Sequence, residues 1–200
     1  MNADPSASPE ALLAALQARR SRGPRGLGLP APTPEDQQRA AELALRAPDH
    51  QGLRPFRFVH VGADERSALG ELFARVAAVQ GRDAEGVAEA RRRAHAGPAL
   101  LAVVARIRDD VPDVPPHEQW LSVGAAVMNL LNALHLMGYA AKVLGGSAAR
   151  AEAVRGAFCQ PGEQLACWVM AGTADEAAAS PPRGDGRLRD LLVDWVPPGA

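Results

Sequence analysis

The alternation of apolar and polar positions divides the chain into helices and strands, and capping residues mark two of the helix starts. Ser8-Pro9-Glu10 and Thr33-Pro34-Glu35-Asp36 each combine an N-cap side chain, a proline in the first turn and early acidic residues. This combination favours the start of a helix. Spacing of the apolar residues then predicts helices over 9–20, 33–46, 65–80, 84–95, 117–137 and 147–158, and strands over 56–61, 99–105, 139–144, 165–171 and 191–196.

These elements indicate the α+β class, with helices outnumbering the strands and no internal repeat. A chain of 200 residues that is 47% hydrophobic can bury one sizeable core but hardly two. We therefore expect a flexible N-terminal tail over 1–9 and a single domain over 10–200. The last part of that domain, a C-terminal extension, ends in the apolar strand 191–196, which needs a surface to cover it.

The segment 117–137 is apolar nearly all round, and such a helix must be buried on most sides. Its small residues Ser122, Gly124, Ala125 and Ala126 allow another backbone to approach closely. That backbone belongs either to a second subunit or to the core of a monomer. The pattern alone leaves both possibilities open.

Charge and composition exclude several classes of protein. The 22 basic and 23 acidic residues leave no overall basic field, which argues against nucleic acid and anionic membranes as partners. The stretch 121–136 is interrupted by polar residues, so we expect no membrane span. Two cysteines and the lack of a secretory leader favour a reducing cytoplasm.

Searches for self-sufficient catalytic motifs are negative. The five histidines have no metal-ligand spacing, and neither a nucleophile elbow nor a phosphate-binding P-loop is present. The run Gly26 to Ala31 resembles a dinucleotide fingerprint but follows no predicted strand and contains Pro30. Cys159 and Cys167 lack the context of a nucleophile. An enzyme with this sequence is therefore expected to borrow a cofactor and to need no metal.

Two short motifs suit an anionic ligand. Arg19-Arg20-Ser21 offers two guanidinium groups and a hydroxyl to a phosphate, although arginines at a helix C-terminus are also favoured by the helix dipole. Arg46 and His50 flank a proline that breaks the second helix, where they can supply charge and a hydrogen bond. An ordinary turn explains the second motif equally well.

Taken together, the motifs resemble the nitroreductase family, in particular its short members. The resemblance runs from about Ala11 to Thr173. It is carried by Arg19-Arg20-Ser21, Pro32-Thr33-Pro34-Glu35, Arg46-Ala47-Pro48-Asp49-His50, Pro55-Phe56, Ala90-Arg91, Gly97-Pro98, the motifs within Val114 to Asn129, Gly138 and Ala171-Gly172-Thr173.

The resemblance implies a three-layer sandwich with helices around a mostly antiparallel sheet, and a homodimer whose interface contains the long helix. It implies FMN as cofactor and NAD(P)H as electron donor, with hydride passing through flavin N5 to a nitroaromatic, a quinone or a similar electrophile. No side chain is then strictly catalytic, and alternating use of one cleft predicts ping-pong kinetics. The same family pattern assigns residues to the cofactors. It assigns Arg19, Arg20 and Ser21 to the phosphate end of FMN, and Arg46 and His50 to the same flavin from the partner subunit. It assigns Val143, Leu144 and Gly145 again to FMN, and to the nicotinamide nucleotide it assigns Ala133, Leu134, His135, Leu136, Met137 and Gly138.

The chain departs from the family at two places. The short members carry a Trp-Arg-Ser type of sequence where this chain has Val143-Leu144-Gly145, so contacts there must come from the backbone. The tail 175–186 matches poorly, although Arg183 can reach a phosphate. Two alternatives follow: a flavin-binding relative without NAD(P)H turnover, and a non-enzymatic dimeric interaction module. Tyr139, Trp120 and Phe56 are the nearest aromatic candidates for stacking on a flavin, or else core residues.

Overall fold

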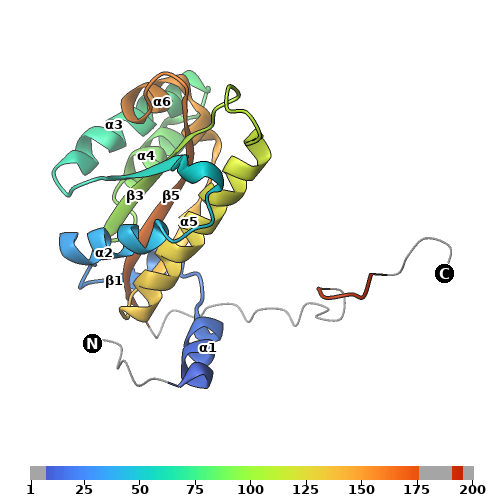
Figure 1. Cartoon of the computed structure of the whole chain (residues 1–200). Coiled ribbons are helices and arrows are strands. Elements are labelled where there is room, and N and C mark those ends of the chain that lie inside the picture. The colour runs from blue at the N-terminus through green and yellow to red at the C-terminus, as the bar shows by residue number, and fades with distance from the viewer. Residues whose placement is uncertain (1–7, 176–190, 196–200) are drawn as a thin grey trace.

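Five antiparallel strands form the centre of the molecule in a computed structural model that describes residues 8–175 and 191–195 (Figure 1). The strand β3 pairs with β2 on one side and with β5 on the other. The strand β5 also pairs with β4 along residues 168–172 and with β1 along residues 173–174. The bounds are β1 Leu27–Gly28, β2 Phe56–His60, β3 Ala99–Arg106, β4 Ala140–Leu144 and β5 Glu163–Ala174.

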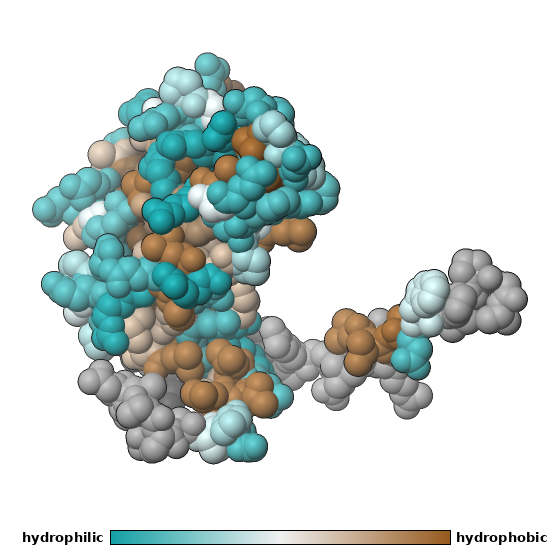
Figure 2. Space-filling view, in the orientation of Figure 1, coloured by the Kyte–Doolittle hydropathy of each residue, from teal (hydrophilic) through white to brown (hydrophobic). Residues whose placement is uncertain are grey.

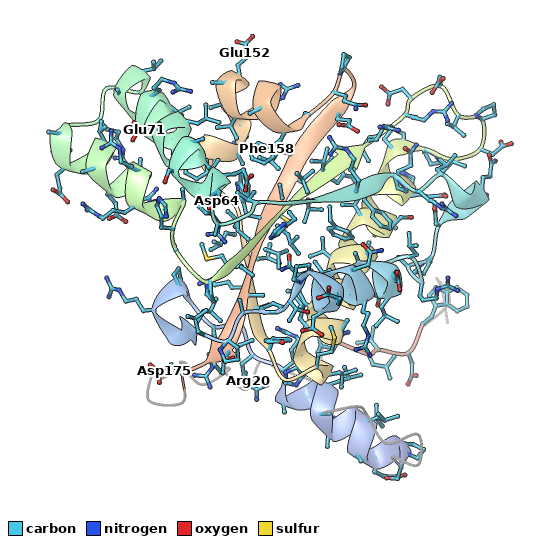
Figure 3. All side chains as sticks on the ribbon, turned by 90° about the vertical axis from the view of Figure 1, so that its left-hand side faces the viewer. Arg20, Asp64, Glu71, Glu152, Phe158 and Asp175 are labelled. Atoms are coloured by element: carbon cyan, nitrogen blue, oxygen red, sulfur yellow. The ribbon has the colours of Figure 1, made fainter. Side chains whose placement is uncertain are left out.

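Helices cover both faces of this sheet, in the three layers that the family resemblance implies (Figures 1 and 3). The α-helices are α1 Pro9–Ala18, α2 Pro34–Ala44, α3 Glu65–Val79, α4 Ala84–Arg93, α5 Pro116–Leu136 and α6 Glu152–Phe158. Short 3-10 turns stand at η1 Pro24–Gly26, η2 His50–Gly52 and η3 Ser147–Arg150. One core packs α2 and α5 on one face, and a second core packs α3, α4 and α6 on the other.

Alternation along β3 explains why two separate cores exist. Leu101 and Val103 face the α2/α5 layer, while Leu100 and Val104 face the α3/α4/α6 layer. Successive side chains of a strand point to opposite faces, so an unbroken apolar run supplies both. The predicted strand 99–105 is confirmed for this reason.

Both predicted helix starts are present. The Ser8 hydroxyl accepts a hydrogen bond from the amide of Ala11 at 3.3 Å. At α2, the Thr33 hydroxyl accepts from the amide of Asp36, and the Asp36 carboxylate accepts from the amide of Thr33. This reciprocal capping box satisfies two amide groups that the helix leaves unpaired.

The structure corrects three predictions. Residues 191–195 form no strand, and the rest of that prediction, Val196, lies outside the described residues. The helix predicted over 147–158 is divided into η3 and α6. A short strand, β1, lies in the segment after α1 that was expected to be loop, because its backbone pairs with the end of β5. Arg183 and most of the expected tail 1–9 also lie outside the described residues, although Ser8 and Pro9 belong to the start of α1.

The helix α1 buries none of its residues against this chain, and its leucines Leu12, Leu13 and Leu16 are 43%, 60% and 39% exposed. It hangs from the lower end of the molecule in Figure 1, and apolar side chains gather over it in Figure 2. A hydrogen bond from Nε2 of His135 to the carbonyl oxygen of Ala15, 2.7 Å long, ties α1 to the end of α5. This contact places the residues after α1 beside the sheet.

Among the described residues, no helix is both long and apolar enough to cross a membrane.

Candidate cofactor site

The motif Arg19-Arg20-Ser21 follows α1 directly and reaches the outer edge of the sheet. Ser21 forms a parallel bridge with Ala141 of β4, so the chain enters the sheet edge at this serine. The side chain of Arg20 is exposed, and its Nη1 donates to the carbonyl oxygens of Gln17 and Arg19 at 2.5 and 3.1 Å. Figure 3 shows Arg20 at the same end of the molecule as Asp175. The two arginines therefore bring positive charge to the sheet edge formed by β4.

The segment Ala133 to Gly138 ends α5 close to this motif, but its members face different ways. Ala133 and Leu134 are buried in the core of the α2/α5 layer, and Leu134 has no exposed surface. His135 is engaged with α1, as described above. Leu136 is 40% exposed, and Gly138 is exposed with a φ of +93°, a conformation that glycine adopts without strain. Contacts to a ligand are open to the second half of this segment, whereas the side chains of Ala133 and Leu134 serve the core.

The segment Val143-Leu144-Gly145 ends β4 at the border of a cavity of about 1100 Å³. Leu144 pairs with Trp168 across the strands, which directs it to the α3/α4 side of the sheet. Among the described residues, no heavy atom lies within 4 Å of the position where a Cβ of Gly145 would stand. Leu144, Gly145 and Ser21 all line the cavity, so the structure brings these predicted residues together.

Arg46 and His50 lie at the opposite end of α5. Nδ1 of His50 is 2.8 Å from Oε2 of Glu118, in the first turn of that helix. Glu118 and His135 are separated by about 26 Å along the helix axis, at a rise of about 1.5 Å per residue. Within one chain, therefore, the two predicted cationic groups do not meet.

The exposed face of α5 connects these two ends. Trp120, Leu121 and Met128 are 39%, 70% and 41% exposed, and Gly124 between them is exposed as well. This spacing puts all four on one side of the helix. The sequence predicted a helix buried on most sides, and the structure leaves this one stripe uncovered.

The aromatic candidates prove to be occupied elsewhere or distant. The hydroxyl of Tyr139 donates to Oδ2 of Asp36 at 2.7 Å, which lowers the pKa of Asp36 and raises that of Tyr139. Phe56 is half-buried against the α2/α5 core, 5.8 Å from the ring of Phe58. Trp120 belongs to the exposed stripe of α5.

Neither cysteine has the properties of a nucleophile. Burial raises the pKa of the Cys167 thiol to about 11, and desolvation also raises that of Cys159. A thiol must ionise to act as a nucleophile, so both remain protonated near neutral pH. The part of the chain that the structure describes contains no group of three or more histidine, cysteine, aspartate or glutamate side chains that could hold a metal ion.

Glu163 has the most strongly lowered pKa, about 2, and lies at the far end of β5 from Ser21. Hydrogen bonds from the Arg57 guanidinium are the main cause, followed by contributions from the Gln160 amide and Arg106. The carboxylate is 1% exposed and enclosed by protein donors. This cluster ties β2, β3 and the start of β5 together and so stabilises the fold.

Comparison with known proteins agrees with this geometry. Residues 16–173 match the Nitroreductase family. A protein of Haemophilus influenzae named "Putative NAD(P)H nitroreductase" is 33% identical over 153 residues, which are 76% of this chain and 83% of that protein. The "Putative NAD(P)H nitroreductase YdjA" of Escherichia coli K12 is 28% identical over 155 residues, 77% of this chain and 84% of that protein.

The chain therefore belongs to the nitroreductase family, and its curated relatives include the YdjA type. The fold is also that of the nitroreductases. A crystal structure of "a putative nitroreductase in complex with fmn" from Desulfovibrio desulfuricans superposes with a TM-score of 0.65 at 22% identity, covering 96% of this chain and 100% of that one.

The sequence did not predict that basic side chains, including Arg25, Arg82 and Lys142, line one cavity. They come from three distant segments, and each one reads in the sequence as an ordinary surface cation. A local motif carries no signal for such a grouping.

Proposed function

We propose that this protein is an FMN-dependent oxidoreductase that passes electrons from NAD(P)H to an organic electrophile such as a nitroaromatic or a quinone. Membership of the nitroreductase family supports this, together with the names of the relatives and the FMN in the Desulfovibrio structure. The observation that carries the proposal is the position of Ser21 alongside β4, which brings Arg19 and Arg20 to the sheet edge next to the cavity that Ser21 itself lines.

The residues at this edge fit the chemistry of FMN. A phosphate monoester requires cations and hydrogen-bond donors, and Arg19, Arg20 and Ser21 supply both. An isoalloxazine ring requires an apolar strand edge with accessible backbone groups. The end of β4 offers Leu144 and the open side of Gly145. The replacement of family side chains at 143–145 thus leaves backbone contacts as the means of holding the ring.

When bound, FMN would supply hydride-transfer chemistry at its N5 between the reduced nicotinamide and the second substrate, and Arg19, Arg20 and Ser21 would hold its phosphate. For a quinone, the balanced reaction consumes NAD(P)H and one proton and yields NAD(P)+ and the hydroquinone. The side chains of this chain contribute position and electrostatics: the cations hold the phosphate, and nearby donors stabilise negative charge on the reduced ring system. Alternating occupation of one cleft gives ping-pong kinetics, with the exposed end of α5, Leu136 to Gly138, contacting the nicotinamide nucleotide.

The same proposal requires a homodimer. Glu118, the contact of His50, is about 26 Å along α5 from His135, the contact of α1, by the helical rise, and Arg46 precedes His50 by four residues. Two copies that pack α5 against α5 in antiparallel fashion bring the His50 end of one chain to the Ser21 end of the other. The exposed stripe of Trp120, Leu121, Gly124 and Met128 supplies an apolar surface for that packing.

Flavin content and reduction separate this function from its two alternatives. The purified protein, reconstituted with FMN, is expected to bind one FMN per chain and to lose its visible flavin absorbance when NADH or NADPH is added without oxygen. A yellow protein that does not bleach is a flavin binder without NAD(P)H turnover. A protein that retains no FMN is an interaction module, and the enzyme proposal fails.

A further inference from the structure

The cavity beside β4 is strongly basic. Its lining includes six cations, and Glu89 is its one acidic residue. The six are Arg22, Arg25, Arg82, Arg92, Arg93 and Lys142. The whole chain has 22 basic and 23 acidic residues, so an even distribution would give similar numbers of each around the cavity. The excess of positive charge is therefore local to the cavity.

Three of these six cations have no acidic partner among the described residues. Nη2 of Arg92 lies 2.7 Å from Glu85 and 2.9 Å from Glu89, and Arg93 also approaches Glu89. By contrast, Arg25, Arg82 and Lys142 have no acidic partner within the described parts of the chain. Like charges that face one space repel one another, and an anion in that space removes the repulsion.

The floor of the cavity is apolar and partly aromatic. Lys142 pairs with Met170 and Leu144 with Trp168 across β4 and β5, which places these side chains on the same face of the sheet. Phe73 of α3 meets the ring of Trp168 edge-on, with 5.8 Å between the centroids. A floor of this kind accepts a flat hydrocarbon ring, and the cations accept a negative group attached to that ring.

Position relates the cavity to the proposed flavin edge. Leu144 and Gly145 border the cavity and also end the strand against which FMN is proposed to lie. Arg19 and Arg20, the proposed phosphate ligands, do not line it. The cavity thus adjoins the flavin edge, and most of its charge lies on α4, the turn before it and η1.

We propose that this cavity selects aromatic acceptors that carry a carboxylate, with the carboxylate among Arg25, Arg82 and Lys142 and the ring against the floor of Trp168 and Met170. The selection of an acceptor rests on the proposed function. The binding of an aromatic carboxylate does not, because the cavity and its charges belong to the chain itself.

The test compares 4-nitrobenzoate with 4-nitrobenzamide, which share the ring and the nitro group and differ in charge. With the FMN-loaded enzyme, KM for the nitrobenzoate is expected to be about tenfold lower than for the amide, since a charge-assisted hydrogen bond contributes about that factor. Arg82→Gln and Lys142→Gln should each reduce this ratio to about two or less. Arg75→Gln, which removes an exposed arginine of α3 outside the cavity, should retain the full ratio.

Calorimetric titration of the oxidised protein with both compounds, without NAD(P)H, separates the two proposals. If the enzyme oxidises no nicotinamide but still binds the nitrobenzoate about tenfold more tightly, the proposed function fails and the anion site stands. Equal affinity for the two compounds in the wild type, or an unchanged ratio in both variants, overturns the anion site. Loss of FMN in Arg82→Gln also overturns it, because the cavity then belongs to the flavin.

Discussion

Two groups of arginines at opposite ends of β5 use the same side chain for different purposes. At Glu163, Nη2 of Arg57 donates to the carboxylate at 2.5 Å and to the carbonyl oxygen of Phe158 at 2.6 Å, and Arg106 donates to the same carboxylate at 2.8 Å. Around the cavity, Arg25 and Arg82 have no acidic partner among the described residues. The first group shares an acidic partner within the protein, and among the described residues Arg25 and Arg82 of the second group have none.

The difference shows how structural and ligand-binding cations can be told apart. A strongly shifted pKa marks the enclosed group, because burial and short hydrogen bonds act together on Glu163. Perturbed titration often indicates a functional site. Here it marks a carboxylate that already accepts hydrogen bonds from Arg57, Arg106 and the Gln160 amide, so the presence or absence of an acidic partner is the better guide.

The largest effect is expected from Glu163→Gln, which breaks the ion pairs of Glu163 with Arg57 and Arg106. Removing the charge takes the shared partner away from Arg57 and Arg106, whose side chains are 36% and 55% exposed, and leaves a neutral amide in the buried position of Glu163. The free energy of unfolding should fall by about 3 kcal/mol, which corresponds to the lowering of the Glu163 pKa from 4.5 to about 2. Urea denaturation measures this change. Glu71→Gln, which breaks an exposed pair with Arg91, serves as control and should leave stability nearly unchanged, because solvent screens an exposed ion pair.

The same carboxylate predicts a pH dependence. Because the folded-state pKa of Glu163 is lowered to about 2 from an ordinary 4.5, its contribution is complete above the ordinary value and is lost as pH falls towards 2. The difference in stability between wild type and Glu163→Gln should therefore shrink between those two pH values. A constant difference across this range would contradict the role given to the Arg57 contact.

The next effect concerns the cations proposed for the cofactor. In Arg19→Ala combined with Arg20→Ala, the dissociation constant of FMN should rise about 100-fold, since each charge-assisted contact contributes at least about 1.5 kcal/mol. Stability of the apoprotein should change by less than about 1 kcal/mol, because the motif follows an exposed helix. Fluorescence titration with FMN gives the constants, with Arg75→Ala as control. Equal affinities in the wild type and the double variant would remove the phosphate assignment.

A smaller effect tests whether the exposed stripe of α5 forms the proposed dimer interface. Leu121→Asp with Met128→Asp places charge on the exposed stripe of α5 and should weaken dimerisation by about 2 kcal/mol or more. Val79→Asp changes an apolar side chain of α3 that is 89% exposed and should leave assembly unaltered. Sedimentation at several concentrations reports the association. A dimer of undiminished strength would place the interface elsewhere.

The smallest effect is expected at the hydrogen bond from Tyr139 to Asp36. Tyr139→Phe removes the donor to Asp36 while the capping box with Thr33 remains, so the loss of stability should be about 1 kcal/mol. The pKa of Asp36 should rise, because the Tyr139 hydrogen bond is the main cause of its lowering. Carboxyl chemical shifts followed with pH measure that rise, and an unmoved titration would contradict this cause.

Local chemistry made much of the fold predictable. The capping box at Thr33 and the continuous apolar strand of β3 depend on neighbours in sequence, and both appear where predicted. The segment 191–195 does not follow its pattern, because apolar residues show that a surface must be covered without showing which surface. Leu192 and Trp195 are 90% and 80% exposed in this chain.

The site was predictable in its motifs but not in its assembly. Arg19-Arg20-Ser21 is visible in the sequence, whereas the bridge from Ser21 to Ala141 and the bond from His135 to Ala15 join positions about 120 residues apart. No local pattern fixes such pairs. The burial of Leu134 is likewise decided by how α5 rotates against the sheet, which the all-round apolar sequence leaves open.

Mixing two defective variants tests most directly whether one FMN site is built from two chains. Arg19→Ala/Arg20→Ala and Arg46→Ala/His50→Ala should each bind FMN poorly as homodimers. In a purified mixed dimer, one of the two sites contains natural residues from both chains, so about one FMN per dimer should bind with wild-type affinity. If the mixed dimer binds no more FMN than either parent, the residues act within their own chains and the shared site is contradicted.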